Sequence, residues 1–251
     1  MKKKFTILCS LFLLVFSLEQ SAAQEFNYLP KTKKGVLVHH KYYSLSYVHT
    51  YKDAEWVAYK LTDEMIQGPA VRHDKFCVDS TVPGGTAGQD DYPGKDYDRG
   101  HLCPADDMSF SQSATDTTFY MSNMTPQMGS FNRGIWKKLE EKVRLWVKKY
   151  KELYIVSGPI LKKGLQRIGP EKDISVPMEF YKIVLVNTKT TKKMIAFILP
   201  HTKSAAALAT FAVPVDSVEK RTGINFFPSL PNALENKLEK SVVLDGWDGI
   251  Q

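Results

Sequence analysis

The chain has 251 residues, of which 43% are hydrophobic, 12% aromatic and 24% charged, a balance typical of a globular protein with a sizeable core. This composition excludes a mainly disordered or fibrous chain, and three cysteines are too few for a disulfide scaffold. The formal net charge of +7 favours polyanionic partners without identifying one.

The beginning of the chain has the order of an export signal. Three lysines at positions 2–4 precede an apolar run over residues 5–18, and small residues follow up to Ala23. The run is too short to cross a bilayer comfortably, and no later segment has the length of a membrane span. We therefore predict a signal peptide over residues 1–23, cleavage near Ala23, and export to the periplasm or the extracellular medium.

The rest of the chain, residues 24–251, is predicted to be a single domain, because no linker divides it. Residues 25–45 look irregular, whereas the aromatic and branched residues over 54–61 predict a strand. The glycines and prolines between residues 79 and 104 predict a long loop. This loop lacks the strand–glycine–helix context of a nucleotide-binding loop, which we exclude.

The clearest helix begins near Asn132 and extends to Tyr150, because apolar residues recur there at steps of three and four. Three strands are then predicted at residues 153–156, 180–186 and 194–199, with a polar turn between the last two.

A second helix is predicted after Asp216. Asp216 and Glu219 have the spacing of a capping box, and Gly223 is placed to end the helix. Strands and helices do not alternate regularly along the chain, which favours an α+β fold over a doubly wound parallel sheet.

The segment from Asp98 to His101, with the sequence DRGH, contains residues suited to phosphate-ester chemistry. An imidazole can take a proton from water near neutral pH, and the guanidinium of Arg99 can hold phosphate oxygens. Taken alone, the tetrapeptide is weak evidence, and a salt-bridged loop histidine explains it better.

Two further polar segments follow, MSNMTPQ over residues 121–127 and FNRGIWKKLE over residues 131–140. Each polar residue in them has an ordinary structural explanation. Asn123 suits a turn, Asn132 suits a helix N-cap, and Glu140 suits a solvated partner of a surface cation. The combination of these two segments with DRGH is far more specific than any one of them.

Together the three segments resemble the DNA/RNA non-specific endonucleases of the ββα-metal, or His-Me finger, class, which includes mitochondrial endonuclease G and secreted bacterial sugar-non-specific nucleases. The resemblance continues through the later strands and the C-terminal helix, over a core of about residues 45–245. It implies a mixed, mainly antiparallel sheet flanked by helices, with a ββα-metal catalytic core.

The resemblance also implies roles for individual side chains. His101 matches the general base that activates water, and Arg99 matches an arginine that stabilises charge on the phosphoryl oxygens. Asn132 matches the ligand of one divalent ion, usually Mg²⁺, with Mn²⁺ or another divalent cation as alternatives. Asn123 matches a polar residue of the active-site cleft.

Two matches are less direct. Eight helical residues rise about 12 Å, so Glu140 is expected to reach an ion held by Asn132 only through water. Arg72 matches a further phosphate-contacting arginine in a less distinctive neighbourhood, and a surface salt bridge explains it equally well.

Other polar residues are left with open alternatives. Cys77 and Cys103 can be hypothesised to form a disulfide that staples the catalytic loop. Asp106 and Asp107 either raise the pKa of His101 or face solvent. The remaining histidines lack the spacing of a zinc site and are expected to be structural or exposed; they are His39, His40, His49, His73 and His201.

The leading hypothesis is therefore an exported, Mg²⁺-dependent endonuclease that hydrolyses DNA and RNA with little sequence preference. A catalytically inactive nucleic-acid-binding protein on the same fold is the alternative, and an exported basic adhesion protein is a weaker one. Homodimers occur in the family, so a homodimer is an open expectation, although nothing in the sequence identifies a dimer face.

Overall fold

The computed structural model describes residues 25–92, 96–171 and 173–251. The predicted signal peptide, residues 1–23, lies outside the described residues. Within the described residues no helix has both the length and the apolar character needed to cross a membrane.

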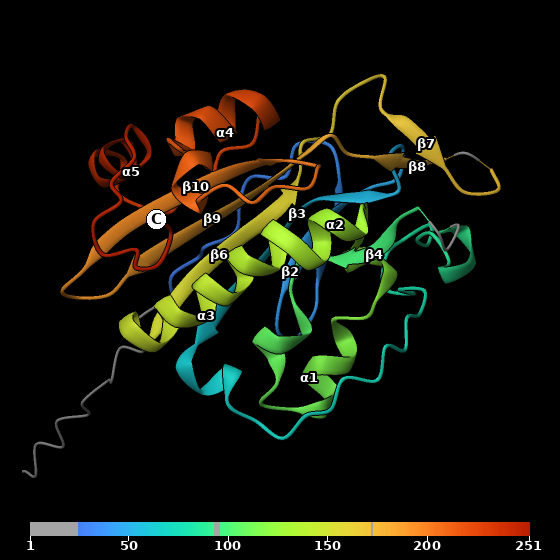
Figure 1. Cartoon of the computed structure of the whole chain (residues 1–251), viewed down its shortest axis with the longest axis horizontal. Coiled ribbons are helices and arrows are strands. Elements are labelled where there is room, and N and C mark those ends of the chain that lie inside the picture. Colours follow the sequence, from blue (N-terminus) through green and yellow to red (C-terminus); the bar gives the residue numbers. More distant parts are fainter. Residues whose placement is uncertain (1–24, 93–95, 172) are drawn as a thin grey trace, which may run out of the picture.

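A seven-stranded sheet forms the centre of the described part of the chain, and each pair of neighbouring strands in it is antiparallel (Figure 1). In spatial order the strands are β1 (Val36–His39), β2 (Ser44–Val48), β3 (Asp53–Thr62), β6 (Glu152–Pro159), β9 (Glu179–Asn187), β10 (Lys192–Pro200) and β11 (Ala212–Val213). The predicted α+β class with a mainly antiparallel sheet is confirmed.

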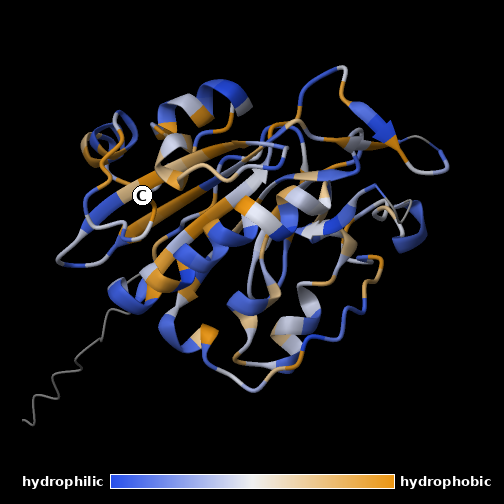
Figure 2. Ribbon diagram, in the orientation of Figure 1, coloured by the Kyte–Doolittle hydropathy of each residue, from blue (hydrophilic) through white to orange (hydrophobic). Residues whose placement is uncertain are grey.

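Helices cover both faces of this sheet. The long helix α3 (Lys137–Tyr150) lies against one face, and α4 (Val215–Thr222) and α5 (Asn232–Glu239) lie against the other (Figure 1). Side chains of β9 alternate between the two resulting cores, with Val184 in the α3 core and Ile183 in the α4–α5 core. Figure 2 shows the consequence, since the strands are mostly hydrophobic and the helices present hydrophilic residues to the outside.

A second hairpin carries the DRGH segment. Strand β4 (Asp98–His101) pairs antiparallel with β5 (Met124–Gln127), and α1 (Gln112–Thr117) lies in the connection between them. The prediction of loop throughout residues 79–104 is therefore wrong at its end. Gly100 is required by close packing, because a Cβ there would lie 2.2 Å from Cδ of Gln127.

The chain enters α3 through a distorted turn. After β5 it forms the short helix α2 (Gly129–Phe131) and then a π-helical turn, η5 (Asn132–Trp136), which continues into α3. Gly134 has non-helical dihedrals inside this turn (φ −104°, ψ −112°). Strands β4 and β5 with the following helix give the two-strands-and-helix unit that the sequence predicted, with a π turn that it did not.

The other predicted elements are partly confirmed. The strands at 54–61, 153–156, 180–186 and 194–199 are present within β3, β6, β9 and β10. The prediction of irregular structure over 25–45 is confirmed for residues 25–35 and is wrong beyond them, because β1 and the start of β2 form the edge of the sheet there. A small hairpin of β7 (Gln166–Ile168) and β8 (Ile174–Val176) was not predicted.

Helix α4 ends as predicted but does not begin with the predicted capping box. Gly223 terminates α4 in the left-handed conformation (φ +73°), as predicted. Pro214 holds the N-cap position and no side-chain cap bond is present, so the capping-box prediction is wrong. The Glu219 carboxylate instead accepts a hydrogen bond from the Phe226 backbone N–H at 2.9 Å.

Candidate active site

A cavity of about 640 Å³ opens between β4, the start of α3 and the loop that precedes β4. Its lining brings together five of the side chains that the sequence predicted for the site, namely Arg72, Arg99, His101, Asn132 and Glu140. Residues that the sequence analysis did not assign to the site also line it, including Asp98, Arg133 and Lys137. Asn123 is absent from the lining.

His101 is the last residue of β4 and is 8% exposed. Trp136 fixes its backbone by donating from Nε1 to the His101 carbonyl at 3.2 Å, and Phe119 packs edge-on against the imidazole with 4.8 Å between centroids. Nε2 of the ring has no hydrogen-bond partner among the described residues. Its lone pair or proton is therefore not committed to another side chain of the described chain.

Burial first, and the charge of Arg72 second, lower the pKa of His101 to about 3. The imidazole is therefore neutral at physiological pH and able to accept a proton. The suggestion that Asp106 and Asp107 raise the pKa of His101 is not supported. Asp107 is buried against other partners, and Asp106 is exposed and 3.5 Å from Arg144.

Asn132 is held by an aspartate that the sequence analysis did not assign to the site. Its Nδ2 donates to Oδ2 of Asp98 at 2.9 Å, and Arg133 donates to Oδ1 of the same carboxylate at 2.6 Å. Asn132 has helical dihedrals, so the N-cap explanation does not hold. With the amide nitrogen engaged, the side-chain oxygen of Asn132 is the atom available to a cation, and oxygen is the ligand that Mg²⁺ prefers.

Glu140 lies on the same cavity wall despite the eight residues that separate it from Asn132. The π turn between them departs from the regular helix on which the 12 Å estimate was based, and it was not predictable from residue spacing. The surface interpretation of Glu140 is not supported, because burial raises the pKa of its carboxyl group while nearby Lys182 opposes that rise.

Lys182 belongs to a buried charged cluster behind Glu140. This β9 side chain is fully buried, and its Nζ lies 4.6 Å from the centroid of the Trp136 ring. Burial lowers the pKa of Lys182, and the carboxylates of Glu140 and Asp107 oppose that shift. Asp107 accepts from the Tyr59 hydroxyl at 2.8 Å and from Nη1 of Arg144 at 3.1 Å. The cluster thus sets the buried carboxylate of Asp107 and the half-buried carboxylate of Glu140 near two cations.

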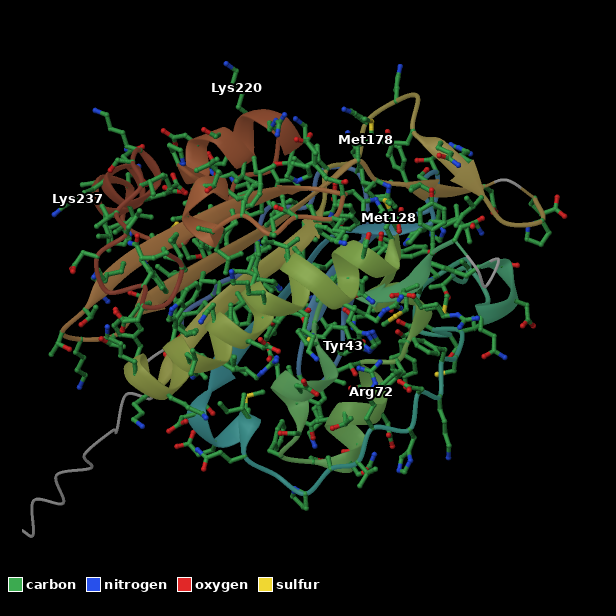
Figure 3. All side chains as sticks on the ribbon, viewed as in Figure 1. Tyr43, Arg72, Met128, Met178, Lys220 and Lys237 are labelled. Atoms are coloured by element: carbon green, nitrogen blue, oxygen red, sulfur yellow. The ribbon has the colours of Figure 1, made fainter. Side chains whose placement is uncertain are left out.

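Arg72 and Arg99 line the cavity and lie over aromatic rings. The guanidinium of Arg99 is 5.0 Å from the Phe76 centroid and donates to the Gln89 carbonyl at 2.6 Å. Arg72 is exposed, lies 5.3 Å from the centroid of Phe119, and forms an ion pair with Asp74 at 2.6 Å. Figure 3 shows Arg72 on the side of the molecule away from Lys220. The salt-bridge explanation for Arg72 therefore holds and the side chain also lines the cavity, whereas its contact with phosphate stays a prediction.

Asn123 does not face the cavity, which corrects the prediction for this residue. It is fully buried, and its Nδ2 donates to the carbonyls of Cys103 and Thr118 at 2.9 and 2.8 Å. Its Oδ1 accepts from the Cys103 N–H at 2.9 Å. The side chain thus fixes the backbone two residues after His101.

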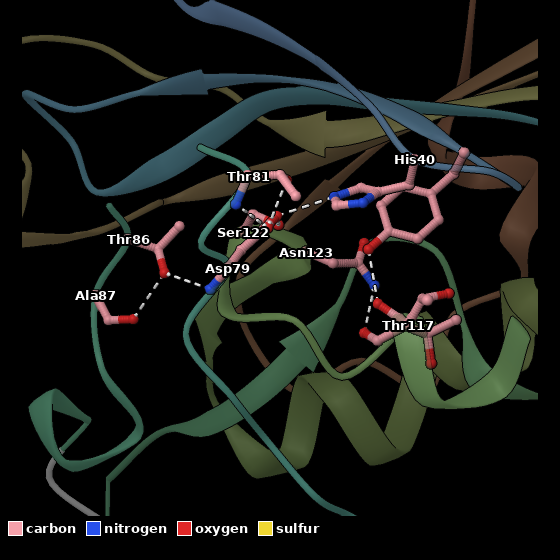
Figure 4. Close-up of polar contacts among 10 residues, drawn as sticks. His40, Asp79, Thr81, Thr86, Ala87, Thr117, Ser122 and Asn123 are labelled. Atoms are coloured by element: carbon pink, nitrogen blue, oxygen red, sulfur yellow. Dashed lines mark hydrogen bonds and ion pairs between the residues drawn. The ribbon is translucent and has the colours of Figure 1, made fainter. Parts of the chain in front are cut away.

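Two other histidines, His40 and His201, form hydrogen bonds outside the cavity lining. His40 contacts Oδ2 of Asp79 at 2.9 Å, and Ser122 donates to the same oxygen at 2.5 Å (Figure 4). Burial alone would raise the pKa of Asp79, but these hydrogen bonds lower it to about 2. His201 accepts from the Met128 N–H at 2.6 Å, immediately before α2. The predicted structural roles of His40 and His201 fit these contacts.

The hypothesised disulfide is not formed. Cys77 is an exposed free thiol and Cys103 is a buried free thiol. The Asn123 hydrogen bonds, rather than a cross-link, hold the backbone of Cys103.

Comparisons with known proteins agree with this geometry. The family model for DNA/RNA non-specific endonucleases matches residues 22–233. The chain is 34% identical over 210 residues to the mitochondrial nuclease of Saccharomyces cerevisiae, an alignment that covers 74% of this chain and 64% of the yeast protein. It is 36% identical over 204 residues to Nuclease C1 of Cunninghamella echinulata, covering 75% and 81% of the two chains.

A solved structure shares the fold. The crystal structure of the EndoG/EndoGI complex, a study of EndoG inhibition, superposes with a TM-score of 0.73 at 30% identity. The superposition covers 80% of this chain and 89% of the solved chain.

The same comparisons overturn the predicted destination of the protein. Relatives from Saccharomyces cerevisiae, Schizosaccharomyces pombe, Danio rerio and Caenorhabditis elegans are all named as mitochondrial. The prediction of a periplasmic or secreted protein, which depended on the first 23 residues alone, is wrong on this evidence.

Proposed function

The chain belongs to the family of DNA/RNA non-specific endonucleases, and from this premise we propose that it hydrolyses phosphodiester bonds of both DNA and RNA with the help of a divalent cation. One observation carries the proposal. The neutral imidazole of His101 and the side chain of Asn132 line the same cavity as Arg72 and Arg99.

His101 is proposed as the general base. A group must be unprotonated to accept the proton of an attacking water, and the imidazole meets this condition throughout the neutral range. The pKa of about 3 would make it a weak base in the free enzyme. A bound phosphodiester carries a negative charge that offsets the effect of Arg72, so substrate binding is expected to raise the pKa and strengthen the base.

The oxygen donors of the cavity fit a divalent cation, and we propose Mg²⁺. Asn132 would hold the ion through its side-chain oxygen, and Glu140 would contact it through water. When bound, the ion would polarise the phosphate and offset negative charge on the leaving oxygen. Asp98 orients the Asn132 amide by accepting from Nδ2, which fixes the direction of the oxygen.

Arg72 and Arg99 are proposed to hold the phosphate oxygens. Their stacking on Phe119 and Phe76 limits side-chain motion, so less entropy is lost when a phosphate binds. These contacts address the backbone of a nucleic acid and not its base edges, which supports weak sequence preference. The intact set of His101, Asn132 and both arginines does not favour an inactive binding protein.

Cleavage assays on supercoiled plasmid and on single-stranded RNA test this proposal. The full chain is expected to degrade both with Mg²⁺ and neither with EDTA, and His101→Ala is expected to abolish both activities. His39→Ala is the matched control, because His39 is exposed on edge strand β1. Plasmid binding without cleavage at any Mg²⁺ concentration would refute the proposed activity and favour the binding protein.

A further inference from the structure

Three carboxylates gather between α4 and α5, on the face of the sheet opposite α3. One oxygen from each of Asp216, Glu219 and Glu239 lies within 4.8 Å of the other two. Because α4 and α5 pack on a core separate from that of α3, this group is not part of the cavity around His101 (Figure 1). The proposed nuclease chemistry makes no use of it.

The innermost carboxylate of this group lacks the partner that a buried charge requires. Glu239 is only 4% exposed, and its Oε1 has no hydrogen-bond partner among the described residues. Leaving a buried polar oxygen unpartnered is costly, and an ionised carboxylate costs more. An atom in this condition indicates that something absent from the protein chain satisfies it.

Basic residues of the same two helices do not supply that partner. Arg221 of α4 pairs with Glu179 at 2.7 Å. Lys220 and Lys237 extend outward from α4 and α5 (Figure 3). Among the described residues, none of the three clustered carboxylates takes part in an ion pair within 4.0 Å. The charge of the cluster is therefore not offset by the protein.

We propose that Asp216, Glu219 and Glu239 form a calcium site that joins α4 to α5. Calcium binds oxygen ligands at 2.3–2.6 Å, so two ligands of one ion lie at most about 5 Å apart, which the observed spacing satisfies. The donors are all carboxylate oxygens, which select a hard cation over zinc or copper. Three carboxylates on separate turns fit the adaptable geometry of calcium better than the strict octahedron of magnesium.

The ion would stabilise a part of the molecule that has little other support. Both helices have eight residues, a length at which an isolated helix is unstable in water. Val218 of α4 and Leu238 of α5 pack on the same core. A cation shared by the two helices would hold these apolar faces on the sheet.

The competing explanation is that a proton on the carboxylates, and not a calcium ion, offsets the negative charge of the cluster. Burial, with the neighbouring charges of Glu219, Glu235 and Asp216, raises the pKa of Glu239 to about 8. A neutral Glu239 would then lie beside charged carboxylates without an ion. The two explanations differ in their response to calcium, because an ion that binds must displace this proton.

Thermal unfolding of the metal-free full chain, with and without added Ca²⁺, tests the proposal. Calcium is expected to raise Tm by several degrees, and Asn132→Ala is expected to keep this rise because its site is the cavity. Asp216→Asn and Glu239→Gln are expected to lose it. Glu141→Gln, which removes an exposed carboxylate of α3, is the matched control and should keep it.

Calorimetric titration of Ca²⁺ in two buffers of different ionisation enthalpy supplies a second measurement. Binding is expected to release protons in the wild type near pH 7. No rise in the Tm of the wild type at millimolar Ca²⁺ would overturn the proposal in favour of a shared proton. An equal rise in Tm in all the variants would also overturn it, because the ion would then bind elsewhere.

Discussion

Glu140 and Glu239 are carboxylates on opposite faces of one sheet, Glu140 half-buried and Glu239 buried, and the charges around them differ. Near Glu140 the charges are mixed, because Lys182 and Arg144 oppose the rise in pKa that burial causes whereas Asp107 and Asp106 add to it. Glu239 lies near three other carboxylates, whose charges add to that rise. Cations of the chain therefore partly offset the cost of an ionised Glu140, whereas the charges near Glu239 add to the cost of ionising it.

The two faces of the sheet therefore carry different arrangements of charge. The cavity face sets cations of the chain near Glu140, which partly offset the charge of its carboxylate. The other face leaves its charges unbalanced, so its stability depends on solution conditions. Changes to each cluster should consequently have different effects.

The largest expected effect comes from removing the buried cation. Lys182→Met removes a buried cation whose charge favours ionised Glu140 and Asp107 without an ion pair within 4.0 Å among the described residues, which should lower the free energy of unfolding by about 1–3 kcal/mol. Urea denaturation measures this loss. Lys189→Met, in the exposed turn after the same strand, is the control and should change stability by less than about 0.5 kcal/mol.

A smaller effect tests whether Lys182 and Glu140 are coupled. In the Lys182→Met background, Glu140→Gln removes a buried charge that has lost its partner, so the double variant should show a coupling energy of about 0.5–3 kcal/mol. A double-mutant cycle in urea gives the value. Strict additivity of the two single changes would show that Lys182 serves Trp136 and not the carboxylate.

The smallest expected effect is the pH dependence of the metal-free protein. Glu239 keeps its proton up to about pH 8 when folded but loses it near pH 4.3 when unfolded, so its contribution to stability falls as pH rises between these values. Glu239→Gln has no such proton to lose and should be more stable than the wild type at pH 8 by on the order of 1 kcal/mol or more.

Unfolding in EDTA at pH 5 and pH 8 checks this difference. The advantage of Glu239→Gln should shrink at pH 5. An advantage of the same size at both pH values would mean that the carboxyl group does not titrate in this range.

The site was largely predictable because its main residues lie in short contiguous segments. DRGH forms strand β4 as a unit, which places Arg99 and His101 at one end of the cavity. Asn132 and Glu140 were assigned to one site by the resemblance of their segment and not by helix spacing, which alone put them about 12 Å apart.

Residues that reach the site through the sheet could not be predicted in this way. Lys182 lies within a strand whose neighbours are apolar, and only the position of β9 behind α3 brings it near Glu140. Asn123 was assigned to the cleft because its segment resembles the family. A loop sequence, however, does not show in which direction a side chain points. The capping box failed for a related reason, since Glu219 bonds to Phe226 seven residues later.

The most direct test of the central claim is the cleavage rate of supercoiled plasmid measured against Mg²⁺ concentration for the wild type, His101→Ala and Asn132→Ala. Loss of a general base should lower the saturated rate of His101→Ala by about 10²–10⁴-fold and leave the half-saturating Mg²⁺ concentration unchanged. Loss of the proposed ligand should instead raise the half-saturating concentration for Asn132→Ala. Wild-type rates and wild-type Mg²⁺ dependence in both variants would contradict the assignment of this cavity as the catalytic site.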